Sequence, residues 1–239
     1  MKKLNKKTIS RQVPLYSDPE LPPAEDDFRK TFEWRVFKIM SEFIEGFHFL
    51  ADIKKTVTVF GSTSLPETNK HYQEARKFGF LIAKKGYSVV TGGGPGIMEA
   101  ANRGCYEAGK DSIGMNIELS EGQRMNKYVN KPIGFNYFFT RKVMLSFSSE
   151  AFVFFPGGFG TLDEFFEMVT LVQTKKLGRK VPIIVVGLDY WGPLLKWIKD
   201  DVYGKYGAIK KTDFDIINTV ANVEKAVELV LKLNTKKFK

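Results

Sequence analysis

From residue 56 onward, short apolar segments alternate with longer stretches in which apolar residues recur at helical spacing. The apolar segments predict strands at Thr56–Phe60, Tyr87–Thr91, Ser112–Ile117, Ala151–Phe155 and Pro182–Val186. The longer stretches predict helices at Lys70–Lys84, Ile97–Ala108, Tyr137–Phe147, Leu162–Thr174, Trp191–Val202 and Ala221–Leu233. Strands that alternate with helices form parallel sheets covered on both faces. The sequence therefore predicts an α/β fold, a Rossmann-like three-layer sandwich with a mainly parallel sheet and helices on both faces.

The chain before these elements divides into two parts. Residues 1–27 are polar and contain several prolines, which favours a flexible leader. The segment from Phe28 to Leu50 predicts a helix with a broad apolar face, and we expect it to pack on the core or on another subunit. A length of 239 residues suits one domain. We place a single Rossmann-like domain, with this helix as its N-terminal extension, at residues 28–235.

The sequence offers few residues for metal or cofactor chemistry. Cys105 is the only cysteine, which excludes an internal disulfide and a cysteine-based zinc site. His48 and His71 are the only histidines, and neither belongs to a metal-ligand pattern. No aspartate cluster near the start suits calcium, and no lysine lies in the frame of a pyridoxal phosphate site. These counts argue against a Ser-His-Asp site and predict a reaction without metal or cofactor.

The net charge of +10 does not by itself indicate nucleic acid as a partner. The lysines are dispersed and densest at the two ends, and no RNP, zinc-finger or helix-turn-helix signature accompanies them. No apolar run approaches the roughly 20 residues of a membrane-spanning helix. The basic start is followed by polar residues where a signal peptide would have an apolar core. We therefore expect a cytoplasmic protein with neither a nucleic-acid nor a membrane partner.

The segment PGGFGTLDEFFE, Pro156–Glu167, follows directly on a predicted strand. An apolar strand that leads through Gly157, Gly158 and Gly160 into a helix is the layout of an anion site. Glycines let backbone N–H groups approach a ligand closely, and the free amides and dipole of a helix start favour phosphate. The segment therefore predicts a phosphate-binding loop.

A carboxylate, Glu164, falls within the first turn of the helix expected after this loop, where a bound phosphate would repel it. Thr161 and Glu164 are three residues apart, which also fits a capping box in which each side chain satisfies an orphan N–H. The spacing alone leaves open whether Glu164 is a catalytic group or a cap.

Two further glycine-bearing loops are expected at the same edge of the sheet. In parallel sheets, ligands collect outside the carboxyl ends of the strands. The loops at that edge are Gly61–Ser64, Gly92–Gly96 and Gly157–Thr161. The candidate contacts in the first two loops are Gly61, Ser62, Gly93 and Gly94. Three such loops together indicate a site of nucleotide size.

These loops do not match the common cofactor or nucleoside triphosphate motifs. The first loop lacks G-x-G-x-x-G, Pro95 interrupts the second, and the Walker pattern is absent. The sequence therefore argues against a dinucleotide-dependent dehydrogenase and against hydrolysis of nucleoside triphosphates. Glu99, in the first turn of the helix after the second loop, either contacts ribose hydroxyls or interacts with the helix dipole.

Three motifs in order resemble the Lonely Guy family of nucleoside 5'-monophosphate phosphoribohydrolases, many of which carry the label lysine decarboxylase. They are FFTRKVML at Phe138–Leu145, AFVFFPGGFGTLDEFFE at 151–167 and TLVQT at Thr170–Thr174. The family's PGGxGTxxE motif is met at 156–164, and its arginine–lysine pair is met by Arg141 and Lys142. GGGPGIMEAANRG resembles the family's other glycine loop. FFTRK and the helical extension resemble the family's longer subtype, and the likeness covers roughly 28–230.

The resemblance implies that water cleaves the N-glycosidic bond of a nucleoside 5'-monophosphate, releasing a free base and ribose 5-phosphate. AMP and N6-modified cytokinin ribotides are the substrates that it implies, and Arg141 and Glu164 are the catalytic residues. The implied substrate and phosphate contacts are Lys142, Gly157, Gly158, Phe159, Gly160, Thr161, Asp163 and Thr170. A further family glutamate corresponds to Glu121. The resemblance also implies a homo-oligomer, at least a dimer.

A carboxylate near the phosphate suits this chemistry. Breaking a ribosyl C–N bond passes through an oxocarbenium-like state, which a carboxylate stabilises while it orients or deprotonates the attacking water. The phosphate loop would fix the nucleotide about one ribose length from the bond that breaks. Arg141 can clamp the phosphate or ribose, or stabilise the departing base, and the sequence does not decide. The alternative is a mononucleotide-binding or sensing protein without hydrolysis, in which Glu164 is a cap.

Overall fold

The computed structural model describes residues 31–118, 125–177 and 181–235. The leader predicted for residues 1–27 lies outside these ranges, and so does the candidate Glu121.

Seven parallel strands form one sheet in the order β4-β3-β2-β1-β5-β6-β7. The strands are β1 (Thr56–Phe60), β2 (Ser88–Thr91), β3 (Ser112–Ile117), β4 (Lys131–Phe135), β5 (Phe152–Phe154), β6 (Ile183–Val186) and β7 (Ile217–Val220). Every residue of the five inner strands is buried, as expected where helices cover both faces. The prediction of an α/β fold with a parallel sheet is confirmed.

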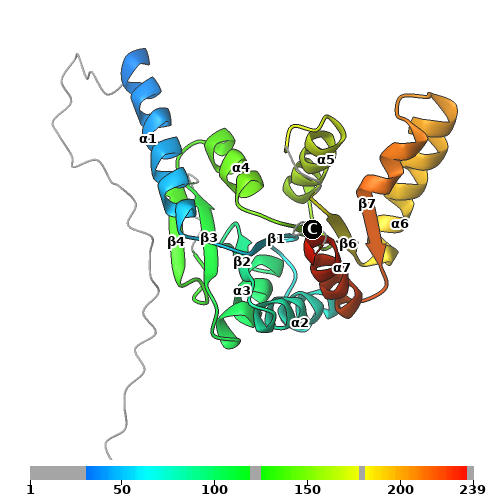
Figure 1. The fold of residues 1–239 in the computed structure, drawn as a ribbon, viewed down its shortest axis with the longest axis horizontal. Helices are drawn as coiled ribbons and strands as arrows, with labels where there is room; N and C mark the ends of the chain where they lie inside the picture. The colour runs from blue at the N-terminus through cyan, green and yellow to red at the C-terminus, as the bar shows by residue number, and fades with distance from the viewer. Residues whose placement is uncertain (1–30, 119–124, 178–180, 236–239) are drawn as a thin grey trace, which may run out of the picture.

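Helices form a layer on each face of the sheet (Figure 1). They are α1 (Phe32–Ala51), α2 (Lys70–Lys84), α3 (Ile97–Glu107), α4 (Phe138–Phe147), α5 (Phe159–Gln173), α6 (Leu188–Trp197) and α7 (Val223–Thr235). Helices α2, α3 and α7 lie below the sheet in this view, α4 and α5 lie above it, and α6 stands at the right beside β7. Trp191 of α6 belongs to the same apolar cluster as Phe165 of α5. Helix α1 packs against α4 and β4.

The core consists of two apolar clusters, one under each helical layer. Successive residues of β5 belong to opposite clusters, since Val153 packs with α2 and α7 whereas Phe152 and Phe154 pack with α5 and α6. This alternation is the two-residue period of a strand that is buried on both sides. The apolar run that predicted a strand therefore supplies both halves of the core.

The two edge strands were not predicted from the sequence. The sequence patterns predict no strand between Ile117 and Tyr137, but Lys131–Phe135 forms β4 and pairs with β3. Strand β4 contains Pro132, which cannot donate to a ladder and is tolerated at a sheet edge. Strand β7 is mostly half-buried and follows a short 3₁₀ helix, η3 (Lys211–Ile216). The predicted helix Trp191–Val202 is also wrong in extent, because α6 continues as a π-helix, η2 (Ile198–Lys205).

The order of the strands reverses between β1 and β5. Strands β1 to β4 follow one another toward one edge of the sheet, and β5 to β7 follow one another toward the other. Ligands of open parallel sheets bind in the crevice at such a switch point, outside the carboxyl ends of the strands. The loops after β1 and β5 carry Gly61 and Gly157, so this topology favours a site between these two loops.

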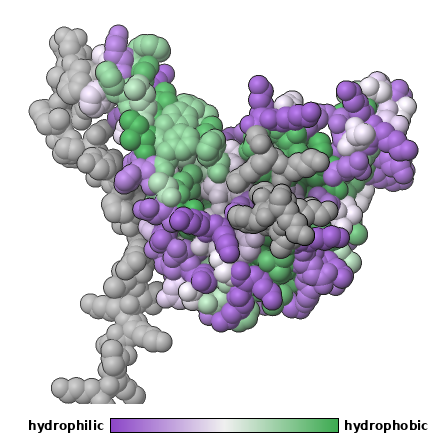
Figure 2. Space-filling model, viewed as in Figure 1, coloured by the Kyte–Doolittle hydropathy of each residue, from purple (hydrophilic) through white to green (hydrophobic). Residues whose placement is uncertain are grey.

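Apolar side chains gather over α1 and the adjoining α4 on the face shown in Figure 2. The large apolar residues exposed on these two helices are Phe32, Val36, Phe37, Met40, Ile44, Phe47, Phe138, Phe139 and Phe147. In the part of the chain that the structure describes, no helix combines the length and the apolar character needed to cross a bilayer.

Candidate active site

The three glycine-bearing loops predicted to share an edge are in contact. The N–H of Ser62 donates to the carbonyl oxygen of Pro156 at 2.9 Å, which joins the loops after β1 and β5. The N–H of Ile97 donates to the carbonyl oxygen of Ser62, also at 2.9 Å, which joins the loops after β1 and β2. Gly96 has a φ of +68°, and a Cβ there would lie 2.3 Å from the same carbonyl oxygen. The loops therefore meet at the switch point.

The loop after β5 begins α5 in a way that leaves its outer side open. Gly158 is the N-cap residue, and its carbonyl oxygen accepts from the N–H groups of Thr161 and Leu162 at 3.0 and 3.1 Å. A Cβ on Gly158 or on Gly160 would meet no atom within 4 Å, whereas a Cβ on Gly157 would lie 2.1 Å from the hydroxyl of Thr161. Gly157 thus allows close packing against Thr161. Gly158 and Gly160 border open space, where an anion can approach the helix start.

The prediction that Glu164 lies in the first turn is wrong. Helix α5 begins at Phe159, about a turn earlier than predicted, so Glu164 lies in the second turn. No side chain caps this helix start, which excludes the capping-box interpretation of Thr161 and Glu164.

Glu164 is half-buried, and one of its carboxylate oxygens has no hydrogen-bond partner in the described part of the chain. Burial raises the pKa of its carboxyl group from 4.5 to about 7, although the positive charges of Lys142 and Arg141 lower it. Its Oε2 atom is buried and has no hydrogen-bond partner among the described residues. Buried polar atoms are normally hydrogen-bonded, so an orphaned carboxylate oxygen requires an explanation, such as a ligand or water.

Arg141, on α4, reaches across to the loop after β2. Its Nε donates to the carbonyl oxygen of Met115 in β3 at 2.8 Å. A Cβ on Gly92 would lie 2.2 Å from an Nη atom of Arg141, so the guanidinium rests against that glycine. Burial lowers the pKa of Arg141, and the negative charge of Glu164 raises it. The charges of the two predicted catalytic residues therefore influence each other in this structure.

Lys142 pairs with two carboxylates of α5. Its Nζ pairs with Glu167 at 2.7 Å and with Asp163 at 2.9 Å. Burial alone would lower the pKa of Lys142, but these two ion pairs raise it above its usual value. Lys142 thus joins α4 to α5 in this structure, and its predicted contact with a substrate stays a prediction.

The other candidates occupy different positions around the site. The carboxylate of Glu99 accepts from the hydroxyl of Tyr72 at 3.2 Å. The hydroxyl of Thr170 donates to the carbonyl oxygen of Phe166 within α5, at 2.7 Å. Phe159, at the start of α5, is 92% exposed. No observation tests their predicted contacts with a substrate.

Sequence reasoning missed the polar network that shapes the loop after β2. The side chain of Asn126 donates to the carbonyl oxygens of Gly93 and Gly94, at 3.1 and 3.0 Å, and to Asn102 at 3.0 Å. Asn102 also accepts from the hydroxyl of Thr91, which accepts from the N–H of Gly93. No local signal marked Asn126, because its partners are more than 20 residues away in the chain.

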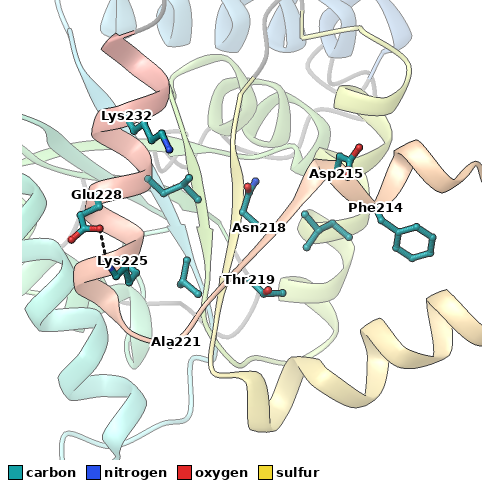
Figure 3. Close-up of a pocket in the computed structure, with 11 residues that line it drawn as sticks. Phe214, Asp215, Asn218, Thr219, Ala221, Lys225, Glu228 and Lys232 are labelled. Atoms are coloured by element: carbon teal, nitrogen blue, oxygen red, sulfur yellow. Dashed lines mark hydrogen bonds and ion pairs between the residues drawn. The ribbon is translucent and has the colours of Figure 1, made fainter.

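A cavity of about 620 Å³ lies elsewhere, along β7 and α7 (Figure 3). None of the residues predicted for the site lines it. Lys225, at its wall, is already paired with Glu228 at 2.8 Å (Figure 3). None of the residues that line the cavity is a glycine, and we do not assign the reaction to it.

Comparison with known proteins finds a matching family model and similar sequences. Residues 98–230, which include Arg141 and Glu164, match the family model described as "Possible lysine decarboxylase". The cytokinin riboside 5'-monophosphate phosphoribohydrolase LOG of Oryza sativa subsp. japonica is 29% identical over 170 residues, 68% of this chain and 66% of that protein. The cytokinin riboside 5'-monophosphate phosphoribohydrolase LOG3 of Arabidopsis thaliana is 28% identical over 183 residues, which are 75% of this chain and 81% of that protein.

Solved structures share the fold at lower identity. The Moco carrier protein from Chlamydomonas reinhardtii superposes with a TM-score of 0.55 and 23% identity, covering 77% of this chain and 99% of that one. The molybdenum cofactor binding protein from Rippkaea orientalis gives a TM-score of 0.54 and 20% identity, covering 75% and 97%. Identities this low establish the common fold alone.

Proposed function

The chain belongs to the family described as possible lysine decarboxylases, and we propose that within it this protein is a nucleoside 5'-monophosphate phosphoribohydrolase. It would hydrolyse the N-glycosidic bond of AMP or of an N6-modified relative. The curated relatives named above carry that activity in their names, with cytokinin riboside 5'-monophosphates as substrates.

The observation that carries the proposal is the state of Glu164. A buried carboxyl group with a raised pKa and an unpartnered oxygen is costly for a structural residue. Perturbed pKa values of this kind cluster at functional sites. Glu164 lies on the helix whose start forms the open glycine loop, and Arg141 is its buried cationic neighbour.

The reaction divides between these groups. The open amides at the start of α5 would bind the 5'-phosphate and fix the ribose. Glu164, once ionised, would stabilise the positive charge that develops at the anomeric carbon and would orient or deprotonate the attacking water. Arg141 would hold the ribose or phosphate, or stabilise the departing base.

Decarboxylation of lysine, which the description of the family model suggests, suits this chain less well. A lysine that forms a Schiff base needs its amine deprotonated, which a lowered pKa provides. Lys142 lies near the site, but its ion pairs with Glu167 and Asp163 raise its pKa, so it remains a cation. We therefore place hydrolysis, and not decarboxylation, at this site.

The test is release of free base from AMP and from isopentenyladenosine monophosphate. The variants Glu164→Gln and Arg141→Ala should each lower kcat/KM by at least 10²-fold, as loss of a principal catalytic group does. Glu228→Gln, on the exposed side of α7, is the matched control and should release base at the wild-type rate. Undiminished release by Glu164→Gln would refute the assignment.

The alternative is binding of a mononucleotide without hydrolysis. It retains the glycine loops and the helix start but gives Glu164 no chemical role. Calorimetry that detects AMP binding, together with no base released over hours, would support this alternative and reject the hydrolase. The orphaned oxygen of Glu164 is the reason we prefer hydrolysis.

A further inference from the structure

Glu42 is a buried carboxylate on α1 that no sequence motif marked. It is 8% exposed and lies in the middle of that helix. Its Oε1 accepts from the backbone N–H of Asn136 at 2.7 Å and from the side-chain amide of Asn136 at 3.0 Å. Its Oε2 accepts from the N–H of Tyr137 at 3.4 Å and from the hydroxyl of Thr140. One carboxylate thus receives four donors from a single short segment.

These donors surround the N-terminus of α4. Tyr137 is the N-cap residue of α4 and makes no side-chain cap bond of its own, and Thr140 lies in the first turn. A negative charge at a helix start satisfies free donors and interacts favourably with the helix dipole. Among the described residues no ion pair involves Glu42. Glu42 therefore caps α4 from another helix.

The next turn of α1 fixes the same two helices against each other. A Cβ on Gly46 would lie 2.6 Å from the sulfur of Met144, so the glycine allows α1 and α4 to approach closely. The rings of Phe47 and Phe147 meet edge to face, with centroids 5.2 Å apart. Helix α1 therefore holds α4 at its start and along its length.

Arg141 follows the capped turn directly. Its backbone N–H donates to the carbonyl oxygen of Tyr137 at 3.2 Å, and the N–H of Tyr137 donates to Glu42. The guanidinium then extends to Met115 and Gly92, where a small displacement would break the 2.8 Å hydrogen bond. The start of α4 thus decides where the guanidinium lies.

We propose that Glu42 is a positioning residue for the reaction: by capping α4, it places Arg141 against the glycine loop and beside Glu164. The effect of Glu42 on catalysis rests on the proposed function. Its capping of α4 rests on the geometry alone. Glu42 lies before the segment that the family model matches, so the family match assigns it no role.

The experiment compares Glu42→Gln with Glu45→Gln in the full chain. Glu45 is exposed on the same helix, so its variant removes an equal charge without touching α4. In Glu42→Gln, an NH2 group replaces one of the two accepting oxygens. Its two N–H groups would face donors at the start of α4 that have hydrogen bonds to the carboxylate in the wild type. We expect amides of residues 136–141 to exchange hydrogen at least tenfold faster in Glu42→Gln, and at the wild-type rate in the control. Equal exchange in the two variants would overturn the proposal.

The catalytic consequence has its own readout, the pH profile of AMP hydrolysis. The charge of Arg141 lowers the pKa of Glu164, so a displaced guanidinium should raise the apparent pKa of kcat/KM in Glu42→Gln, with about a tenfold loss near pH 7. A loss that is equal at every pH would show only general damage and would overturn the positioning role. If the wild type releases no base, the proposed function fails, and the exchange measurement alone decides whether Glu42 caps α4.

Discussion

The ionisation of Glu164 should link catalysis and stability to the same pH range. Burial places the pKa of Glu164 at about 7 in the folded protein, against 4.5 for an exposed glutamate. The hydrolysis needs the ionised form, so kcat/KM should rise as pH increases through about 7 and level off roughly one unit higher. A profile that is flat from pH 5 to pH 8 would contradict the role of Glu164.

The same shift predicts an opposite trend in stability. Between about pH 4.5 and pH 7 the native protein holds a proton on Glu164 that the unfolded chain has released. The stabilising contribution is therefore complete below about pH 4.5 and is lost as pH rises through 7. The difference of about 2.5 between the two pKa values corresponds to about 3 kcal/mol.

The measurement is urea unfolding of the wild type and of Glu164→Gln at pH values from 4.5 to 8. Because other groups titrate alike in both proteins, the difference between their free energies of unfolding isolates Glu164. That difference should shift by about 3 kcal/mol in favour of the variant as pH rises. Relative to the wild type, the variant should therefore gain stability between pH 4.5 and pH 8. It should be inactive at every pH in this range. A difference that does not vary with pH would refute the raised pKa of Glu164.

Two further predictions concern the glycine loop and the surface. Gly92→Ala should lower kcat/KM by at least tenfold, because its Cβ would occupy the position of the Arg141 guanidinium; Gly192→Ala, in an open position on α6, is the control and should leave steady-state rates unchanged. We also propose that the exposed apolar face of α1 mediates self-association, since Phe37 and Ile44 are 60% and 68% exposed. The variant with both residues changed to Glu should have a smaller mass by sedimentation than the wild type, and an unchanged mass would reject α1 as the interface.

The inner strands and the loops of the site could be predicted because their signals are local. A strand buried on both faces, such as Ile183–Val186, can be continuously apolar, and a backbone that approaches a ligand closely favours glycine. Both features can be recognised from residues that are adjacent in the sequence. The edge strand Lys131–Phe135 lacks such a local pattern, because only one of its sides pairs with another strand and Pro132 is tolerated on the other.

The local arrangement of the candidate site could not be predicted from the sequence. The spacing of Thr161 and Glu164 fits a capping box, and only the start of α5 at Phe159 excludes it. The unpartnered oxygen of Glu164 depends on what surrounds it, which the sequence does not specify. The same holds for Glu42, whose partners lie 94 to 98 residues away.

The amino-acid sequence by itself determined the class of fold and the glycine loops, because hydrophobic period and backbone freedom are properties of neighbouring residues. The pair Arg141 and Glu164 was expected from the family resemblance. The tertiary structure decided which groups are charged, capped or left without a partner. Those properties depend on the removal of water and on contacts between distant segments, such as Glu42 with α4 or Arg141 with Gly92.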